Sequence, residues 1–131
     1  MDEYHGGCRV ERAEFKNGEV HTTLRSWEIV DVEVLPKALD WRNKDGINYV
    51  SYNKNELSPH YCGSCWAQGP TSAIADRFNI LNARLKKEHT LVGLSAQVLI
   101  NCQAGGSCNG GDPSGVYEFA HTNGIPHSSC I

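Results

Sequence analysis

The residues best suited to chemistry lie in the hexapeptide Cys62-Gly63-Ser64-Cys65-Trp66-Ala67. Apolar residues spaced near 3.6 follow it and predict a helix that has Ser64 as its N-cap and runs to about Lys87. A thiol in the first turn of a helix lies beside unpaired backbone N–H groups and the positive end of the helix dipole. Both favour the thiolate, which is the nucleophilic form of cysteine. Cys65 is therefore the candidate nucleophile, and a bridged Cys62 would fix the loop that presents it.

This hexapeptide resembles the signature around the catalytic cysteine of papain-like cysteine peptidases. The resemblance extends from about Leu35 to the C-terminus. It includes Asp40-Trp41-Arg42 and Ser107-Cys108-Asn109-Gly110-Gly111, which is similar to the family's C-x-G-G substrate-binding loop. Tyr61 before the hexapeptide and Gly124-Ile125-Pro126 are similar to the cathepsin X subfamily, also called cathepsin Z.

The resemblance implies an α+β fold, of which this chain carries the mainly helical N-terminal lobe. The β-rich second lobe is expected to be missing. Residues 35–131 are expected to form the incomplete peptidase lobe, and residues 1–34 a short, extended, propeptide-like segment with weak strand character. Further helices are predicted over Ala96–Asn101, capped by Ser95, and from about Ser114 to Asn123, ended by Gly124. Pro70 is expected to kink or distort the central helix.

Composition excludes several classes of protein. The net charge of −3 comes from mixed signs without a basic stripe, so nucleic acid is not an expected partner. No apolar run approaches the length of a membrane span, and the polar N-terminus shows no signal peptide. The resemblance and the cysteine pattern imply a lysosomal or secreted protein that folds in an oxidising compartment.

The six cysteines form an even set. The resemblance implies the bridges Cys62–Cys108 and Cys102–Cys130, which leaves Cys65 and Cys8. In the cathepsin X subfamily, a propeptide cysteine pairs with the active-site cysteine and blocks it. Cys8 resembles that residue, so Cys8–Cys65 is the hypothesis for a reversible covalent latch.

A zinc site is the alternative use of these cysteines. Cys62, Cys65, Cys102 and Cys108 could together supply four sulfurs. The second pair is too widely spaced for a usual zinc knuckle, so we expect neither a metal nor another cofactor.

The remaining catalytic groups are harder to find. The nucleophile needs a His base and an orienting group, usually Asn, and the family places that His about 130 or more residues beyond the cysteine. The chain ends at Ile131, so this chain alone is expected to be inactive.

Glu56 aligns with the Gln that supplies the family's second oxyanion donor. An ionised Glu accepts hydrogen bonds only, although a protonated Glu could donate. A misplaced loop alignment is the alternative explanation.

Substrate-binding candidates lie on either side of Cys65. Gly63 and the pair Gly110-Gly111 resemble positions whose bare backbone lets an extended peptide approach the thiol, the alternative being ordinary turn glycines. His60 could bind the substrate's terminal carboxylate in place of the subfamily's His, which aligns with Leu57, or it could be merely exposed.

Two functions follow from these residues. The first is a cathepsin X-like cysteine carboxypeptidase that acts on peptides or proteins and needs the missing C-terminal lobe as partner. The second is a non-catalytic homologue that binds peptides or acts as a decoy.

Overall fold

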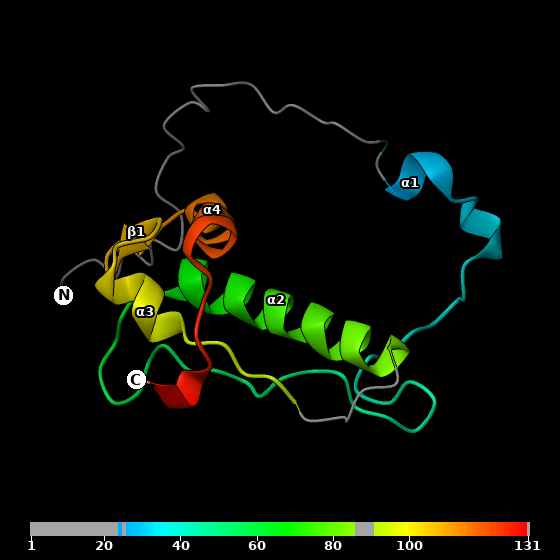
Figure 1. The fold of residues 1–131 in the computed structure, drawn as a ribbon, viewed down its shortest axis with the longest axis horizontal. Coiled ribbons are helices and arrows are strands. Elements are labelled where there is room, and N and C mark those ends of the chain that lie inside the picture. Colours follow the sequence, from blue (N-terminus) through cyan, green and yellow to red (C-terminus); the bar gives the residue numbers. More distant parts are fainter. Residues whose placement is uncertain (1–23, 25, 86–90, 131) are drawn as a thin grey trace, which may run out of the picture.

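The computed structural model describes residue 24 and residues 26–85 and 91–130, and the fold is mainly helical (Figure 1). One long helix, α2, is surrounded by short elements and loops. The elements are, in chain order, α1 (Ser26–Ile29), the 3-10 helix η1 (Val32–Val34), α2 (Cys65–Arg84), α3 (Ala96–Asn101), β1 (Gly106–Ser107), β2 (Gly110–Gly111), α4 (Pro113–Asn123) and the 3-10 helix η2 (Ser128–Cys130).

The core forms where α3 and α4 pack against the first turns of α2. Its buried cluster consists of Trp66, Ala67, Leu99 and Val116. Trp66 and Ala67 come from α2, while Leu99 comes from α3 and Val116 from α4. Phe119, Ile100 and Ile125 pack around the cluster. The core therefore sits directly behind the end of α2 that carries Cys65.

The three main helices begin and end close to their predicted positions. The Ser95 hydroxyl accepts from Val98 N at the start of α3, and the Asp112 carboxylate accepts from Ser114 N at the start of α4. Gly124 ends α4, with its N–H donated to Ala120 O. The helix over Ala96–Asn101 is confirmed, and α4 starts one residue before the prediction because Pro113 suits the first helical position.

Pro70 does not interrupt α2, which continues through it to Arg84. The proline is buried, and the next residue bonds back to the preceding turn. The Thr71 hydroxyl lies 2.8 Å from Ala67 O and 3.0 Å from Gln68 O. The helix therefore continues through a buried Pro70 even though proline has no N–H to donate to Trp66 O, four residues earlier.

The prediction of extended structure is wrong for residues 26–34. They form the helical turns α1 and η1, which stand apart from the helical body in Figure 1. A strand needs a neighbour to satisfy its backbone groups. A helical turn needs only local bonds, and here the Asp31 carboxylate caps η1 by accepting from Glu33 N at 3.1 Å. Residues 1–23 lie outside the described residues.

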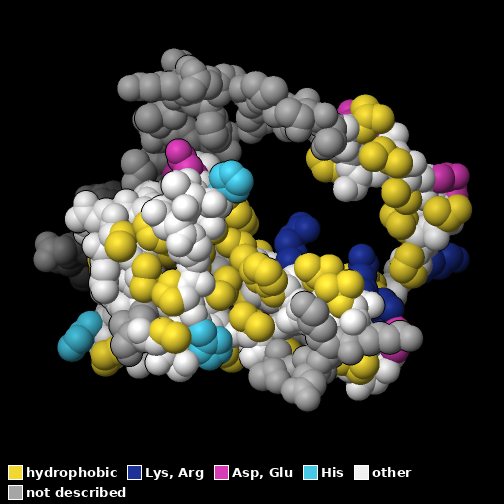
Figure 2. Space-filling view, in the orientation of Figure 1, with side chains coloured by type: hydrophobic (Ala, Val, Ile, Leu, Met, Phe, Trp, Pro, Cys, Tyr) yellow, Lys and Arg dark blue, Asp and Glu magenta, His cyan; other side chains and the backbone are white. Residues whose placement is uncertain are grey.

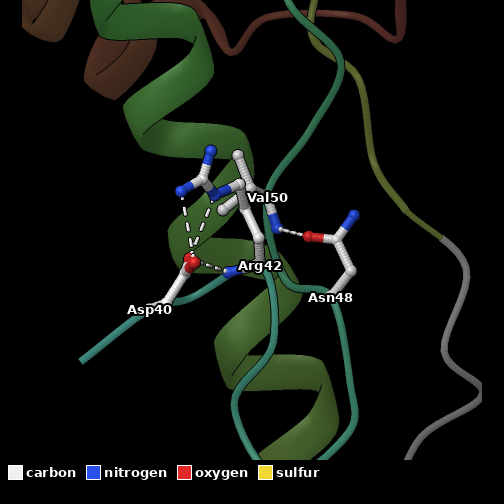
Figure 3. Close-up of polar contacts among 4 residues, drawn as sticks. All are labelled: Asp40, Arg42, Asn48 and Val50. Atoms are coloured by element: carbon white, nitrogen blue, oxygen red, sulfur yellow. Dashed lines mark hydrogen bonds and ion pairs between the residues drawn. The ribbon is translucent and has the colours of Figure 1, made fainter. Parts of the chain in front are cut away.

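The Asp40-Trp41-Arg42 segment folds back on the loop that leads toward Cys62. Arg42 N and Nε donate to Asp40 Oδ1 at 2.9 and 3.0 Å, and Asn48 Oδ1 accepts from Val50 N at 3.0 Å (Figure 3). The bonds from Arg42 lower the pKa of the Asp40 carboxyl below its ordinary value. The Trp41 and Tyr49 rings meet edge to face at 5.9 Å. These local contacts fix the entry of the chain into the lobe.

Much apolar surface remains uncovered. A shallow cavity of about 490 Å³ lies between α2 and α4 and is lined by Ile74, Arg77, Phe78, Leu81 and Tyr117. Figure 2 shows apolar side chains gathered on the face that α2 presents to the viewer. Within the described ranges, no helix has the length and apolar character needed to cross a bilayer.

The buried core predicts the effect of a cavity mutation. Leu99 is fully buried, so Leu99→Ala should lower the free energy of unfolding by about 2–5 kcal/mol through lost burial and a residual cavity. Urea unfolding followed by tryptophan fluorescence measures the change. Leu39→Ala is the matched control because Leu39 is half exposed. Equal effects of the two substitutions would contradict this core.

Candidate active site

Cys65 is the first residue of α2 and its side chain is only partly buried. Ser64 precedes it as the N-cap, as predicted, but its hydroxyl does not cap the helix. The hydroxyl instead accepts from Gln68 Nε2 at 2.7 Å. Cys65 thus lies at the positive end of the helix dipole, which favours a thiolate once the sulfur is reduced.

The disulfide Cys62–Cys108 is confirmed. It joins the turn before Cys65 to residues 105–111, which contain β1 and β2 and are called the glycine-rich loop. Gly63 extends this junction by pairing with Asn109 in a parallel bridge, and its N–H donates to Cys108 O at 2.7 Å. A Cβ on Gly63 would lie 2.8 Å from Cys108 O. Close approach of the two backbones therefore requires glycine at this position.

Gly110 and Gly111 form β2, which pairs antiparallel with β1. Both are buried, and a Cβ on Gly111 would lie 2.5 Å from Gly105 O and 2.7 Å from Trp66 Cδ2. The Trp66 indole also donates from Nε1 to Ser107 O at 2.9 Å. Packing against Trp66 is thus sufficient to explain glycine at position 111.

The Glu56 carboxylate lies beside the first residue of α2 and its N-cap. Its Oε2 accepts from both Ser64 N and Cys65 N at 3.0 Å. Its backbone oxygen accepts from Cys62 N at 2.9 Å. A carboxylate is well suited to the positive end of a helix. The N–H of Cys65 is therefore already occupied by an acceptor within the chain.

His60 is exposed in the same loop, as is Leu57. The loop contains a cis peptide bond between Ser58 and Pro59. His121 and His127 are also exposed, on α4 and just before η2. The structure thus places His60 on the loop that carries Glu56, at the surface.

Cys102 and Cys130 are free, exposed thiols, so the expected Cys102–Cys130 bridge is not formed in this structure. Bonds from Ser95 N to Pro126 O and from Ser128 N to Gly93 O hold η2 beside the start of α3. Cys102 caps the opposite end of α3, about 9 Å away along six helical residues. The two cysteines therefore lie at opposite ends of the helix.

Cys65 is itself disulfide-bonded. Its predicted partner, Cys8, lies outside the described residues, so the latch stays a prediction. The Cys62–Cys108 bond uses two of the four sulfurs that the zinc alternative requires. Among residues 24, 26–85 and 91–130, no three His, Cys, Asp or Glu side chains gather as metal ligands.

The sequence did not indicate that Lys54 is partly buried. Lys54 is half-buried two residues before Glu56, and burial lowers the pKa of its amine, partly opposed by Asp76. Nothing in the local sequence distinguishes Lys54 from a surface lysine, because its burial depends on residues from α2 and from the segment before α3.

The comparisons with known proteins agree with this geometry. The sequence signature of papain family cysteine proteases matches residues 35–131. The chain is 44% identical to cathepsin Z of Onchocerca volvulus over 95% of its own length and 40% of the relative's. It is 37% identical to cathepsin L2 of Homo sapiens over 69% of the chain and 24% of the relative, and 31% identical to ananain of Ananas comosus over 75% and 25%. The chain thus spans less than half the length of these relatives.

Alkylation can count the free thiols of the protein. Native protein treated with an alkylating reagent without reductant should gain two alkyl groups, on Cys102 and Cys130, because both are exposed and free. Intact-mass spectrometry followed by peptide mapping identifies them. Denatured, unreduced protein is the control and should gain the same two groups. If both residues react only after reduction, the protein contains the Cys102–Cys130 bridge and the free thiols of this structure are wrong.

Proposed function

The chain belongs to the papain family of cysteine proteases, and we propose that it forms the nucleophile-bearing part of a cathepsin X-like carboxypeptidase that acts on peptides or proteins. The observation that carries this proposal is the position of Cys65. It begins a 20-residue helix, next to a turn that a disulfide ties to the glycine-rich loop. No other described cysteine combines these features.

In the proposed reaction, the Cys65 thiolate attacks the carbonyl carbon of the substrate's last peptide bond and forms a thioester. A protonated His gives its proton to the departing amine, and water then releases the acid product. The catalytic His and Asn lie outside the part of the family fold that this chain spans. We therefore propose that residues 35–131 are one lobe of the enzyme and that the chain alone does not turn over substrate.

A second lobe is the proposed partner of this chain. The uncovered apolar surface supports this, since Phe78, Leu81 and Tyr117 are each nearly half exposed. Covering such a face with protein would remove apolar area from water and bring the missing base to Cys65.

The proposed substrate contacts come from both sides of the nucleophile. Gly63 and Gly110 would leave room for an extended peptide backbone beside Cys65. Gly111 would contribute by packing against the Trp66 ring. His60 would bind the terminal carboxylate, which requires the loop to turn its imidazolium toward the groove.

Glu56 favours a second candidate function, that of a non-catalytic peptide-binding homologue. The family's oxyanion hole uses the Cys N–H together with a Gln amide. In this chain the Glu56 carboxylate accepts from that N–H. An ionised carboxylate there repels the developing oxyanion, and losing even one donor costs about 3–4 kcal/mol.

The Cys8–Cys65 latch is proposed as the resting state. Cys65 is disulfide-bonded, Cys62 and Cys108 bond to each other, and Cys102 and Cys130 are free. Of the six cysteines of the chain, Cys8 is the one that these statements leave over. A thiol reductant would attack the latch, become oxidised to its own disulfide, and release both thiols. This chemistry suits a secreted or lysosomal protein that folds under oxidising conditions.

The two functions predict different effects of Glu56→Gln. In a version extended by the second lobe, Glu56→Gln should raise kcat/KM for peptides about 10²–10³-fold, because an amide can donate to the oxyanion. Glu118→Gln, on the exposed face of α4, is the matched control and should change nothing. Unchanged activity in Glu56→Gln would remove Glu56 from the oxyanion site. Peptide binding without turnover in every version would favour the second function.

The latch predicts that access to Cys65 depends on reduction. An electrophilic peptide probe should label wild-type Cys65 only after mild reduction, whereas Cys8→Ser should be labelled without reductant. Peptide mapping of the unreduced protein should find Cys8 joined to Cys65. Cys102→Ser is the control, since it should leave labelling dependent on reductant. Labelling of unreduced wild-type protein at Cys65 would disprove the latch.

A further inference from the structure

Lys54 lines an open cavity of mixed polar and apolar character that the proposed peptidase reaction does not use. The cavity has a volume of about 410 Å³ and lies between the loop before Glu56, α2 and the start of α3. Its lining includes Lys54 and a set of amide and hydroxyl side chains, of which the relevant ones are Asn53, Asn55, Gln68, Ser95 and Ser128.

The Lys54 ammonium is held in place by two uncharged acceptors. Its Nζ lies 2.5 Å from Thr71 Oγ1 and 3.2 Å from Leu94 O. The Tyr52 ring lies 6.0 Å away, measured from Nζ to the ring centroid. An ammonium has three N–H donors, so these two acceptors leave one donor for another group.

No carboxylate neutralises this ammonium in the described part of the chain. The ion pairs found there join Arg42 to Asp40 and Lys44 to Asp45. Asp76 acts on Lys54 only at longer range, and its Oδ1 accepts from Ser51 N at 2.7 Å. A partly buried charge without a paired counter-ion is costly, and an anion would offset that cost.

The neighbouring side chains can complete an anion site. The Ser95 hydroxyl already accepts from Val98 N, so its own hydrogen is available to donate. Asn55 Oδ1 accepts from Leu57 N, and the N–H₂ group of the same amide is a further donor among the residues that line the cavity. These donors and one cation match an anion of single charge with two oxygens, because a doubly charged phosphate would exceed the available positive charge.

We propose that this cavity is a carboxylate-binding site anchored by the Lys54 ammonium. The carboxylate would come either from a small free acid or from an acidic side chain of a protein segment. Both sources share the same contacts with Lys54. The site is separate from Cys65 and does not depend on the proposed peptidase function.

Lysine NMR tests the site directly in the 131-residue chain. In protein with ¹³C-labelled lysine, acetate should shift the Lys54 Cε resonance with saturation, giving a dissociation constant on the order of 1–10 mM. Saturating acetate should also raise the pH midpoint of that resonance, because a bound anion favours the charged amine. Sodium chloride at equal ionic strength should do neither.

The second arm distinguishes the two sources. A blocked peptide with one central Glu, compared with its Gln counterpart, should bind at least tenfold more tightly than acetate if a protein segment is the natural ligand. If the peptide binds no more tightly than acetate, the ligand is a small free acid. Both results support the carboxylate site.

Matched variants complete the test. Lys54→Met should abolish acetate binding and the Lys54 resonance, whereas Lys37→Met, at an exposed lysine, should bind acetate as wild type does. The wild-type titration decides the matter even if Lys54→Met fails to fold. The proposal is overturned if acetate leaves the wild-type Lys54 resonance unmoved, or if phosphate of equal ionic strength binds as well as acetate.

Discussion

The packing of Trp66 against the glycine-rich loop is the contact on which the site depends. The indole is buried, donates to Ser107 O, and lies where a side chain at Gly111 would be. The same residue belongs to the core with Leu99 and Val116. One side chain therefore joins the hydrophobic core to the glycine-rich loop beside Cys65. The Cys62–Cys108 bridge closes the junction covalently from the other side.

The start of α2 concentrates positive potential, and the chain places a carboxylate there. Glu56 accepts hydrogen bonds from the N–H groups of Ser64 and Cys65, and so satisfies donors at the helix end that have no partner within the helix. The same N–H groups would bind a developing oxyanion during catalysis. Stability of the helix end and stabilisation of a transition state thus compete for the same donors. This competition is the physical difference between the two candidate functions.

Several surfaces of the chain are shaped for contacts that it does not make itself. The apolar cavity between α2 and α4 is uncovered, and α1 and η1 contain no buried residue. The Lys54 ammonium has only neutral acceptors in the described residues. A lobe that folds as part of a larger unit would have such surfaces, since its core is too small to bury them.

The family and the three main helices could be predicted from the sequence by itself, and the family resemblance implied the Cys62–Cys108 bridge. The helices depend on local signals, namely apolar spacing and the caps Ser95 and Gly124, and the family depends on a motif whose residues are contiguous. The sequence failed for residues 26–34, where a weak alternation suggested strands. Their helical turns need only local hydrogen bonds, such as the one from Glu33 N to the Asp31 carboxylate.

Only the tertiary structure decided that Cys102 and Cys130 stay unbridged, what Glu56 contacts and how Lys54 is buried. Backbone bonds to Gly93 and Ser95 hold the start of η2 beside the start of α3, whereas Cys102 caps the other end of that helix. Glu56 and Lys54 acquire their roles from α2, which approaches their loop from later in the chain. Distances between such segments depend on packing, and no local pattern of residues records them.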